Sequence, residues 1–160
     1  MTVYLVRHAK AGERHVWEGD DEDRPLSGRG RTQSRGLLDV LADATFDRLL
    51  SSPYVRCMET LIPLAAQHGL AIEPVEALAE GGGLEDAVAL VRKHAEHGAV
   101  LCTHGDIIPM LLSHYAERGV DVGRSPQWPK GSTWVLETDG AGDVVAARYV
   151  PPPACTLARA

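Results

Sequence analysis

Short apolar segments alternate along this 160-residue chain with longer segments in which apolar residues recur at helical spacing. The short segments are expected to be strands, at residues 3–6, 46–50, 71–75 and 99–103. The helices expected to follow them cover residues 30–42, 53–68, 84–97 and 106–118. Near-continuous apolar strands are typical of a parallel sheet that is buried on both faces. The pattern therefore predicts an α/β fold, a three-layer sandwich with a mostly parallel central sheet and helices on both faces.

The last third of the chain has a different pattern. Residues 132–137 and 144–150 are strand-like and are joined by the turn-rich sequence "TDGAGD". This arrangement predicts a β-hairpin at the edge of the sheet. Residues 1–150 are therefore expected to form one domain. Residues 151–160, "PPPACTLARA", begin with three prolines and are expected to be a loosely held tail.

Charge and cysteine content restrict the classes of function. The formal net charge of −6 argues against a nucleic-acid polymer as partner, because such surfaces need clustered Lys and Arg in excess. Any bound anion must therefore be captured by a few local cations. Cys57, Cys102 and Cys155 form no CxxC pattern, which favours a reduced, cytoplasmic protein without thiol chemistry. No stretch approaches the length of a membrane span, so a soluble protein is expected.

Two histidines follow two of the expected strands. His8 comes after "VYLVR" and His104 after "AVLCT". In an open α/β sheet the carboxyl ends of the strands form the edge where ligands bind, so the two imidazoles are expected in one crevice. Arg7 precedes the first histidine, and Gly105 follows the second, before a helix whose N–H groups favour an anion. Arg56, in "SSPYVRC", follows a third strand end.

This combination of residues favours phosphoryl transfer through a phosphohistidine. A neutral imidazole nitrogen can attack phosphorus, and the transferred group stays negatively charged throughout. Arg7 and Arg56 offer planar forks that match phosphate oxygens. A protonated His104 would donate to a further oxygen. These three cationic groups already supply the positive charge, so no metal or organic cofactor is expected.

A general acid is also required, because an alkoxide is a poor leaving group at neutral pH. Glu80, in "EALAEGGG", follows the third expected strand, and the three glycines after it leave room beside the carboxyl group. A solvated loop carboxylate is the competing interpretation of Glu80. Glu85 is the weaker candidate, because it falls on an expected helix.

Several other residues are candidates for substrate contact. Lys10, Arg14 and Lys130 are expected to contact an outer phosphate or acidic group of the substrate, or only water. Ser27 is interpreted as the cap of the helix that follows it, and it is also a candidate substrate-binding residue. Gly105 is the third substrate-binding candidate, beside Lys10 and Ser27.

Two clusters are interpreted as lying outside the chemistry. The run "EGDDEDR" at residues 18–24 lacks the ligand spacing of a calcium loop, which favours a solvated, mobile loop near the mouth of the site. His94 and His97 lie three residues apart on an expected helix. Without a third ligand nearby they indicate a polar helix face rather than a metal site.

Four segments, taken together, resemble the signature of the histidine phosphatase superfamily, also called the phosphoglycerate mutase-like family. The segment "LVRHAKAG" is similar to the family's Arg-His-Gly motif, and "RPLSGRGRTQS" to its Leu-Ser/Thr-x-x-Gly-x-x-Gln stretch. The segment "SSPYVRCMETL" is similar to the Ser-Ser-Pro-x-x-Arg-x-x-x-Thr stretch, and "VLCTHGDIIPMLL" to the second histidine motif. Each segment alone is a weak signal, but their order along the chain makes the set specific.

The resemblance implies that His8 is the phosphorylated nucleophile and that Arg7, Arg56 and His104 form the phosphate pocket. It also implies Glu80 as the acid, through the Leu-x-Glu pattern of "LAE". Ala9 stands where the family usually has glycine, a departure toward the small SixA-type phosphohistidine phosphatases. The chain also lacks room for the large insertions that cap the site in mutases and phytases, which favours an open phosphatase site.

The segments "RHAKAG", "GDD", "RPL" and "KGSTWVLE" are similar to the domain fused behind a Nudix hydrolase in some actinobacterial proteins. The expected function is hydrolysis of a phosphomonoester or phosphoramidate, on a small molecule, a nucleotide or a phosphoprotein. Two alternatives stay open: a phosphate- or nucleotide-binding module without turnover that works beside a Nudix hydrolase, and a small mutase. The sequence leaves the substrate and the oligomeric state undetermined.

Overall fold

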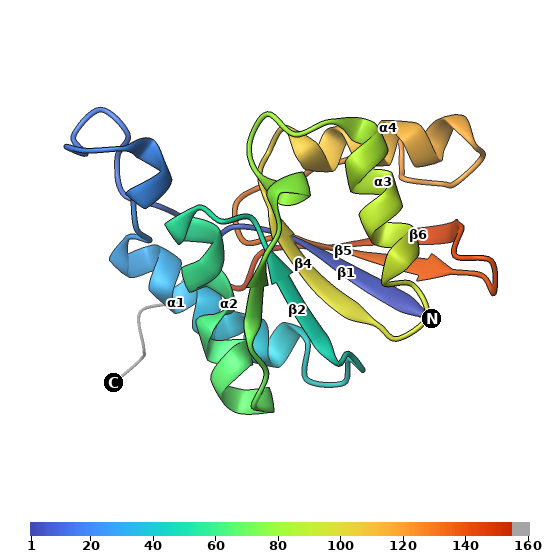
Figure 1. Cartoon of the computed structure of the whole chain (residues 1–160), viewed down its shortest axis with the longest axis horizontal. Helices are drawn as coiled ribbons and strands as arrows, with labels where there is room; N and C mark the ends of the chain where they lie inside the picture. Colours follow the sequence, from blue (N-terminus) through green and yellow to red (C-terminus); the bar gives the residue numbers. More distant parts are fainter. Residues whose placement is uncertain (155–160) are drawn as a thin grey trace.

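The computed structural model describes residues 1–154, which form a six-stranded sheet covered by helices (Figure 1). The strands are β1 (Thr2–Arg7), β2 (Arg48–Ser51), β3 (Ile72–Pro74), β4 (Ala99–Thr103), β5 (Thr133–Thr138) and β6 (Val144–Val150), in the order β3-β2-β4-β1-β5-β6. Strands β1 to β4 pair in parallel. Strand β5 pairs antiparallel with both β1 and β6. The mostly parallel sheet and its edge hairpin are therefore confirmed.

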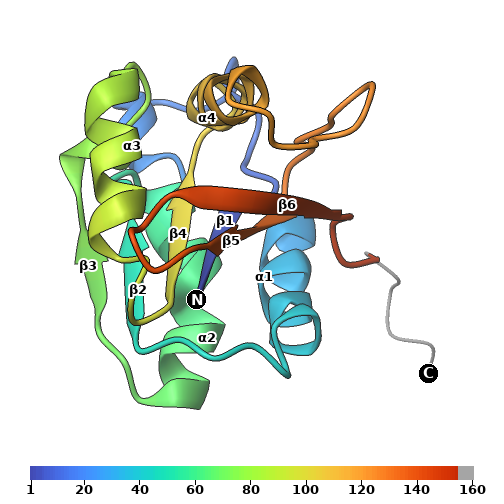
Figure 2. The same cartoon turned by 90° about the vertical axis from the view of Figure 1, so that its right-hand side faces the viewer.

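Four helices cover the two faces of the sheet. They are α1 (Gly28–Val40), α2 (Val55–His68), α3 (Leu84–Lys93) and α4 (Ile107–Glu117). Helices α1 and α2 lie together on one face, and α3 and α4 on the other (Figures 1 and 2). Two short 3-10 helices, η1 (Asp21–Asp23) and η2 (Glu76–Leu78), lie in the connections. This is the three-layer arrangement that the alternating pattern predicts.

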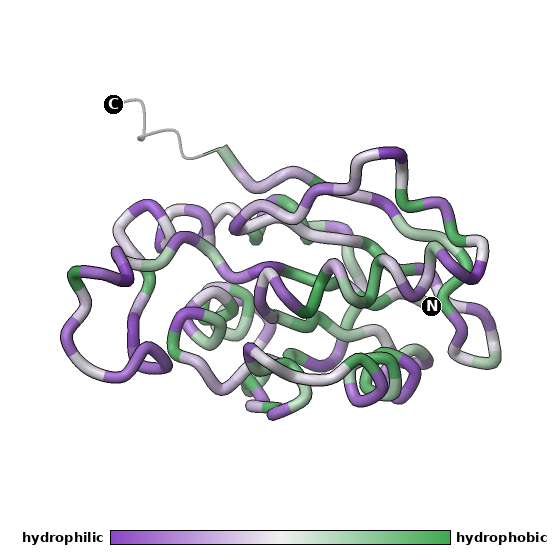
Figure 3. The backbone as a smooth tube through the Cα atoms, turned by 90° about the horizontal axis from the view of Figure 1, so that it is seen from above, coloured by the Kyte–Doolittle hydropathy of each residue, from purple (hydrophilic) through white to green (hydrophobic). Residues whose placement is uncertain are grey.

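Strand β4 shows how the two layers of core are built. All five of its residues are buried. Leu101 belongs to the cluster that contains Leu111 of α4, whereas Val100 and Cys102 belong to the cluster that contains Leu61 of α2. Successive side chains of a strand point to opposite faces, so an uninterrupted apolar strand feeds both cores. Along the helices the tube in Figure 3 alternates between green and purple, as expected for one buried and one exposed face.

Two predicted helix boundaries are wrong. Helix α2 begins at Val55, not at Pro53, because the Ser52 hydroxyl accepts a hydrogen bond from the Tyr54 N–H (3.2 Å) and forms a turn before the helix. Helix α3 ends at Lys93 rather than at residue 97. Its C-cap, His94, is only 7% exposed, so His94 does not lie on a polar, solvated face.

The chain after β6 returns toward α1. A methyl group added at Gly36 would lie 2.4 Å from Cβ of Pro153, so the start of the tail packs closely on this helix. Residues 155–160, with Cys155, lie outside the described residues. Within residues 1–154, no helix is both long and apolar enough to cross a membrane.

Ser27 caps α1, as predicted. Its hydroxyl accepts a hydrogen bond from the Gly30 N–H (3.1 Å) and donates to the Lys10 carbonyl (3.1 Å). We expect Ser27→Ala to lower the free energy of unfolding by about 1 kcal/mol, because a first-turn N–H loses its acceptor. Urea denaturation measures this loss. The control Ser113→Ala, at an exposed position of α4, should change stability by less than about 0.5 kcal/mol. An equal stability for Ser27→Ala and the parent chain would contradict the capping role.

Candidate active site

The carboxyl ends of three neighbouring parallel strands place the predicted catalytic residues together. Strand β4 lies between β1 and β2. In the β1 and β4 pair Arg7 lies opposite Thr103, so the next residues, His8 and His104, are neighbours. The His8 N–H donates to the Thr103 carbonyl (3.0 Å), and the two imidazole centroids are 5.3 Å apart. Two short parallel strands in register thus bring together histidines that are 96 positions apart, from 8 to 104.

The hydrogen bonding of His8 defines its reactive atom. Nδ1 of His8 lies 2.8 Å from the Ala9 carbonyl oxygen. A carbonyl can only accept, so Nδ1 carries the proton and Nε2 keeps its lone pair. Burial lowers the pKa of His8 to about 3, and the nearby His104, Arg56 and Arg7 add to this effect. The imidazole is therefore neutral at physiological pH, as a nucleophile requires.

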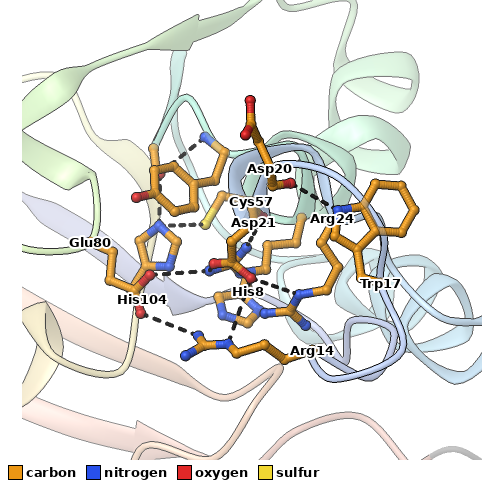
Figure 4. A network of polar contacts seen from close by, with 12 residues as sticks. His8, Arg14, Trp17, Asp20, Asp21, Arg24, Cys57, Glu80 and His104 are labelled. Atoms are coloured by element: carbon orange, nitrogen blue, oxygen red, sulfur yellow. Dashed lines mark hydrogen bonds and ion pairs between the residues drawn. The ribbon is translucent and has the colours of Figure 1, made fainter.

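His104 is held from the side away from His8 by small polar groups. Its Nε2 lies 2.8 Å from the Ser52 hydroxyl and 3.5 Å from Sγ of Cys57 (Figure 4). The Tyr54 ring packs edge-on against the imidazole, with centroids 4.7 Å apart. Nδ1 of His104 is buried and has no hydrogen-bond partner among residues 1–154. A protonated Nδ1 would be available to donate to an anion.

Two arginines complete the inner part of the site. Arg56, in the first turn of α2, is only 1% exposed, and Arg7 comes from the end of β1. Within the described chain, Nε of each guanidinium is buried without a hydrogen-bond partner, as is Nδ1 of His104. Buried donors without acceptors are rare in folded proteins. Three of them near His8 fit a ligand rich in acceptor oxygens, such as a phosphoryl group.

Sequence reasoning missed Asp21, which holds Arg56, and Arg24, which holds Asp21. Arg56 donates to the Asp21 carbonyl (2.8 Å) and carboxylate (3.1 Å), and Arg24 donates to the same carboxylate (3.0 Å). Partial burial raises the pKa of the Asp21 carboxyl, but the hydrogen bonds and charges of Arg24 and Arg56 outweigh this and lower it. Arg24 is 6% exposed, so the interpretation of residues 18–24 as a merely solvated loop is wrong. The only signal in the sequence is the arginine three positions after Asp21.

The site opens into a cavity of about 500 Å³. All five predicted catalytic residues line it: Arg7, His8, Arg56, Glu80 and His104. The other residues in its walls include Lys10, Arg14, Arg24, Gly105, Asp106, Trp128 and Lys130. Glu80 lies in this wall, 3.3 Å from Nη2 of Arg56 and 3.7 Å from Nη2 of Arg14 (Figure 4). Glu85 lies in the first turn of α3 and does not line the cavity.

Two of the three predicted substrate-binding residues have other roles in the structure. Ser27 is not among the residues that line the cavity, and its hydroxyl is used by the helix cap. Gly105 lines the cavity, and its lack of a side chain leaves room for the Arg7 guanidinium. A methyl group added at Gly105 would lie 2.7 Å from Cζ of Arg7. Lys10 lines the cavity as predicted.

The described residues contain no group of three or more His, Cys, Asp or Glu side chains placed to hold a metal ion. The cationic side chains that line the cavity are Arg7, Lys10, Arg14, Arg24, Arg56 and Lys130. Cys57 and Cys102 are buried free thiols, and Cys57 lies beside His104.

A covered α/β sheet whose strand ends gather two histidines and two arginines around one cavity defines a protein suited to binding a phosphoryl group. The sequence matches the profile of the histidine phosphatase superfamily (branch 1) over residues 3–87. The chain belongs to this superfamily, which confirms the resemblance drawn from its four motifs.

Known proteins share this sequence and fold to different extents. An 8-oxo-(d)GTP phosphatase of Mycolicibacterium smegmatis is 36% identical over 157 residues, covering 95% of this chain and 48% of that protein. An uncharacterized protein of Mycobacterium tuberculosis is 37% identical over 75 residues, covering 44% of this chain and 36% of that protein. The chain thus spans about half or less of the length of these relatives.

Solved structures confirm the fold. The protein histidine phosphatase SixA complexed with tungstate has a TM-score of 0.75 at 18% identity, covering 97% of both chains. Bacillus stearothermophilus YhfR has a TM-score of 0.70 at 19% identity, covering 89% of this chain and 93% of that one.

The close contact of Gly105 with Arg7 can be tested by adding one methyl group. Gly105→Ala should displace the Arg7 guanidinium and weaken the binding of inorganic phosphate by about tenfold, since one charge-assisted contact is lost. Titration calorimetry measures this affinity. Gly140→Ala is the matched control, because no atom lies within 4 Å of the added carbon. Unchanged phosphate affinity in Gly105→Ala would contradict this role.

Proposed function

We propose that this chain is a metal-independent phosphatase that hydrolyses a phosphomonoester or phosphoramidate through a phosphohistidine on His8. The observation that carries the proposal is the orientation of His8. Its Nδ1 is bound to the Ala9 carbonyl, so Nε2 keeps a lone pair in a cavity lined by Arg7, Arg56 and His104.

In the first step, Nε2 of His8 attacks phosphorus while the bond from phosphorus to the leaving atom breaks. The leaving atom takes a proton from Glu80. Arg7, Arg56 and His104 stabilise the negative charge on the phosphoryl oxygens. Such electrostatic stabilisation by fixed donors is usually the largest single contribution to catalysis of phosphoryl transfer. The contact of Glu80 with Arg56 (3.3 Å) supports the role of Glu80 as acid, because Arg56 is one of the proposed ligands of the phosphoryl group.

In the second step, a water attacks the phosphorus of phosphohistidine and the bond to Nε2 breaks. The Glu80 carboxylate takes a proton from this water, and inorganic phosphate leaves. Each residue is thereby returned to its starting protonation state, so the cycle requires no redox partner or cofactor.

The comparisons suggest two classes of substrate. The similarity to an 8-oxo-(d)GTP phosphatase supports a nucleotide, and the fold shared with SixA supports a protein phosphohistidine. The identity of 36% to the former, over nearly the whole of this chain, favours the nucleotide. Because the aligned region is only 48% of that relative, its activity as a whole is not assigned to this chain.

The nucleophile is tested by comparing the parent chain with His8→Ala on p-nitrophenyl phosphate, a nucleoside monophosphate and a phosphohistidine peptide. The parent should turn over at least one of them, and His8→Ala should lose at least about a thousandfold in kcat. Phosphate release is the measurement. Turnover that survives in His8→Ala would contradict the proposed nucleophile. Turnover of none of the three by the parent would favour a binding module.

The acid is tested by varying the leaving group. Glu80→Gln should slow the transfer of the phosphoryl group from an alkyl phosphate to His8, followed in single-turnover experiments, by about a hundredfold or more, because the alkoxide must be protonated. The same variant should lose much less on p-nitrophenyl phosphate, whose phenolate leaves without a proton. Glu85→Gln is the matched control. Equal losses on the two substrates in Glu80→Gln would contradict the role of Glu80 as acid.

A further inference from the structure

The cavity around His8 holds more positive charge than the transfer of one phosphoryl group requires. Six cationic side chains line it, against three carboxylates, in a chain whose formal net charge is −6. The cations are Arg7, Lys10, Arg14, Arg24, Arg56 and Lys130, and the carboxylates are Glu13, Glu80 and Asp106. Such a local surplus against the charge of the whole chain indicates a substrate with more than one anionic group.

Two acidic groups in and behind the wall, Asp21 and Glu80, contact arginines and not lysines. Arg14, Arg24 and Arg56 all contact Asp21 or Glu80. Within residues 1–154, neither Lys10 nor Lys130 has an acidic group within 4.0 Å of its ammonium group or a hydrogen bond from it. Both ammonium groups are therefore available to a ligand.

The pKa of Lys130 reflects its cationic neighbours. Partial burial lowers this pKa, and the positive charges of Arg7, Arg24 and Lys10 lower it further, against a smaller opposing effect of Glu13. An anion placed among these groups would relieve the mutual repulsion, so its binding would be favoured by more than one cation.

The side chain of Gln33 links the backbones of Lys10 and Lys130, which both line the cavity. The Gln33 side-chain oxygen accepts from the Lys10 N–H (2.9 Å), and its amide nitrogen donates to the Lys130 carbonyl (3.2 Å). The next N–H, of Gly131, donates to the carbonyls of both Arg7 and His8 (3.1 Å each). The backbones of Lys10 and Lys130 are thus fixed to each other and to the strand end that carries the nucleophile.

We propose that Lys10 and Lys130, clamped by Gln33, form a subsite for a second phosphate of the substrate. The preferred substrate class is then an organic diphosphate or longer phosphate ester, whose terminal phosphoryl group goes to His8. The role of this subsite in catalysis rests on the proposed function of His8. A monophosphate of an uncharged alcohol would leave both lysines without an anion.

Binding separates the subsite from catalysis. In the His8→Ala chain, which lacks the nucleophile, calorimetry compares the dissociation constants of inorganic phosphate and pyrophosphate. Pyrophosphate should bind at least about tenfold more tightly than phosphate, because one further charge-assisted contact forms. Adding Lys10→Gln and Lys130→Gln should reduce this ratio to about one. Adding Lys93→Gln, an exposed lysine of α3 outside the cavity, should leave the ratio unchanged.

Gln33→Met tests whether placement matters in addition to charge. This variant keeps both ammonium groups but removes both hydrogen bonds between Gln33 and the two lysine backbones. It should reduce the preference for pyrophosphate over phosphate at least about threefold. The melting temperature of the variant is measured in the same experiment. A preference that is unchanged in the double lysine variant, while phosphate still binds, would overturn the subsite and leave the proposed function intact. Failure of phosphate and pyrophosphate alike to bind would contradict both proposals.

Discussion

The parallel pairing of β1 with β4 is the interaction on which the site depends. It places Arg7 opposite Thr103, and the first residue beyond each strand is a histidine. Both strands are fully apolar in sequence before this edge and are buried between two helical layers, so a slip in register would expose core side chains as well as separate His8 from His104. The stability of the core and the geometry of the site are therefore set by the same hydrogen bonds.

The second constraint is the cost of burying Arg56. A guanidinium that is 1% exposed needs partners, and Asp21 and Glu80 supply them from two loops (Figure 4). The carboxylates consume part of its hydrogen-bonding capacity and leave Nε without a partner in residues 1–154. Glu80 thereby lies beside Arg56 and partly in solvent, which suits the proposed exchange of protons with a leaving atom and with water.

Much of this arrangement could be predicted from the sequence. The residues that follow parallel strands could be placed at one edge, so Arg7, His8, Arg56 and His104 were found by position and chemistry together. Asp21 and Arg24 could not be found in this way, since a run of acidic residues has the composition of a solvated loop, and its partner Arg56 is 35 positions away. For Ser27 the sequence indicates both a helix cap and a substrate contact, because a hydroxyl beside a motif has the same pattern in either role. The role of Gly105 depends on the path of the Arg7 side chain, which no local pattern describes.

The central claim is that Nε2 of His8 accepts the phosphoryl group, and it is tested most directly by trapping the covalent intermediate. The chain is mixed briefly with a ³²P-labelled phosphomonoester and quenched in base, where phosphohistidine survives, and the labelled residue is identified by peptide mapping. A parallel sample with unlabelled substrate assigns the phosphorylated ring nitrogen by ³¹P NMR. The geometry predicts label on Nε2 of His8 and none in His8→Ala, because Nδ1 is occupied by its bond to the Ala9 carbonyl. Label on another residue, or steady turnover with no labelled histidine, would contradict it.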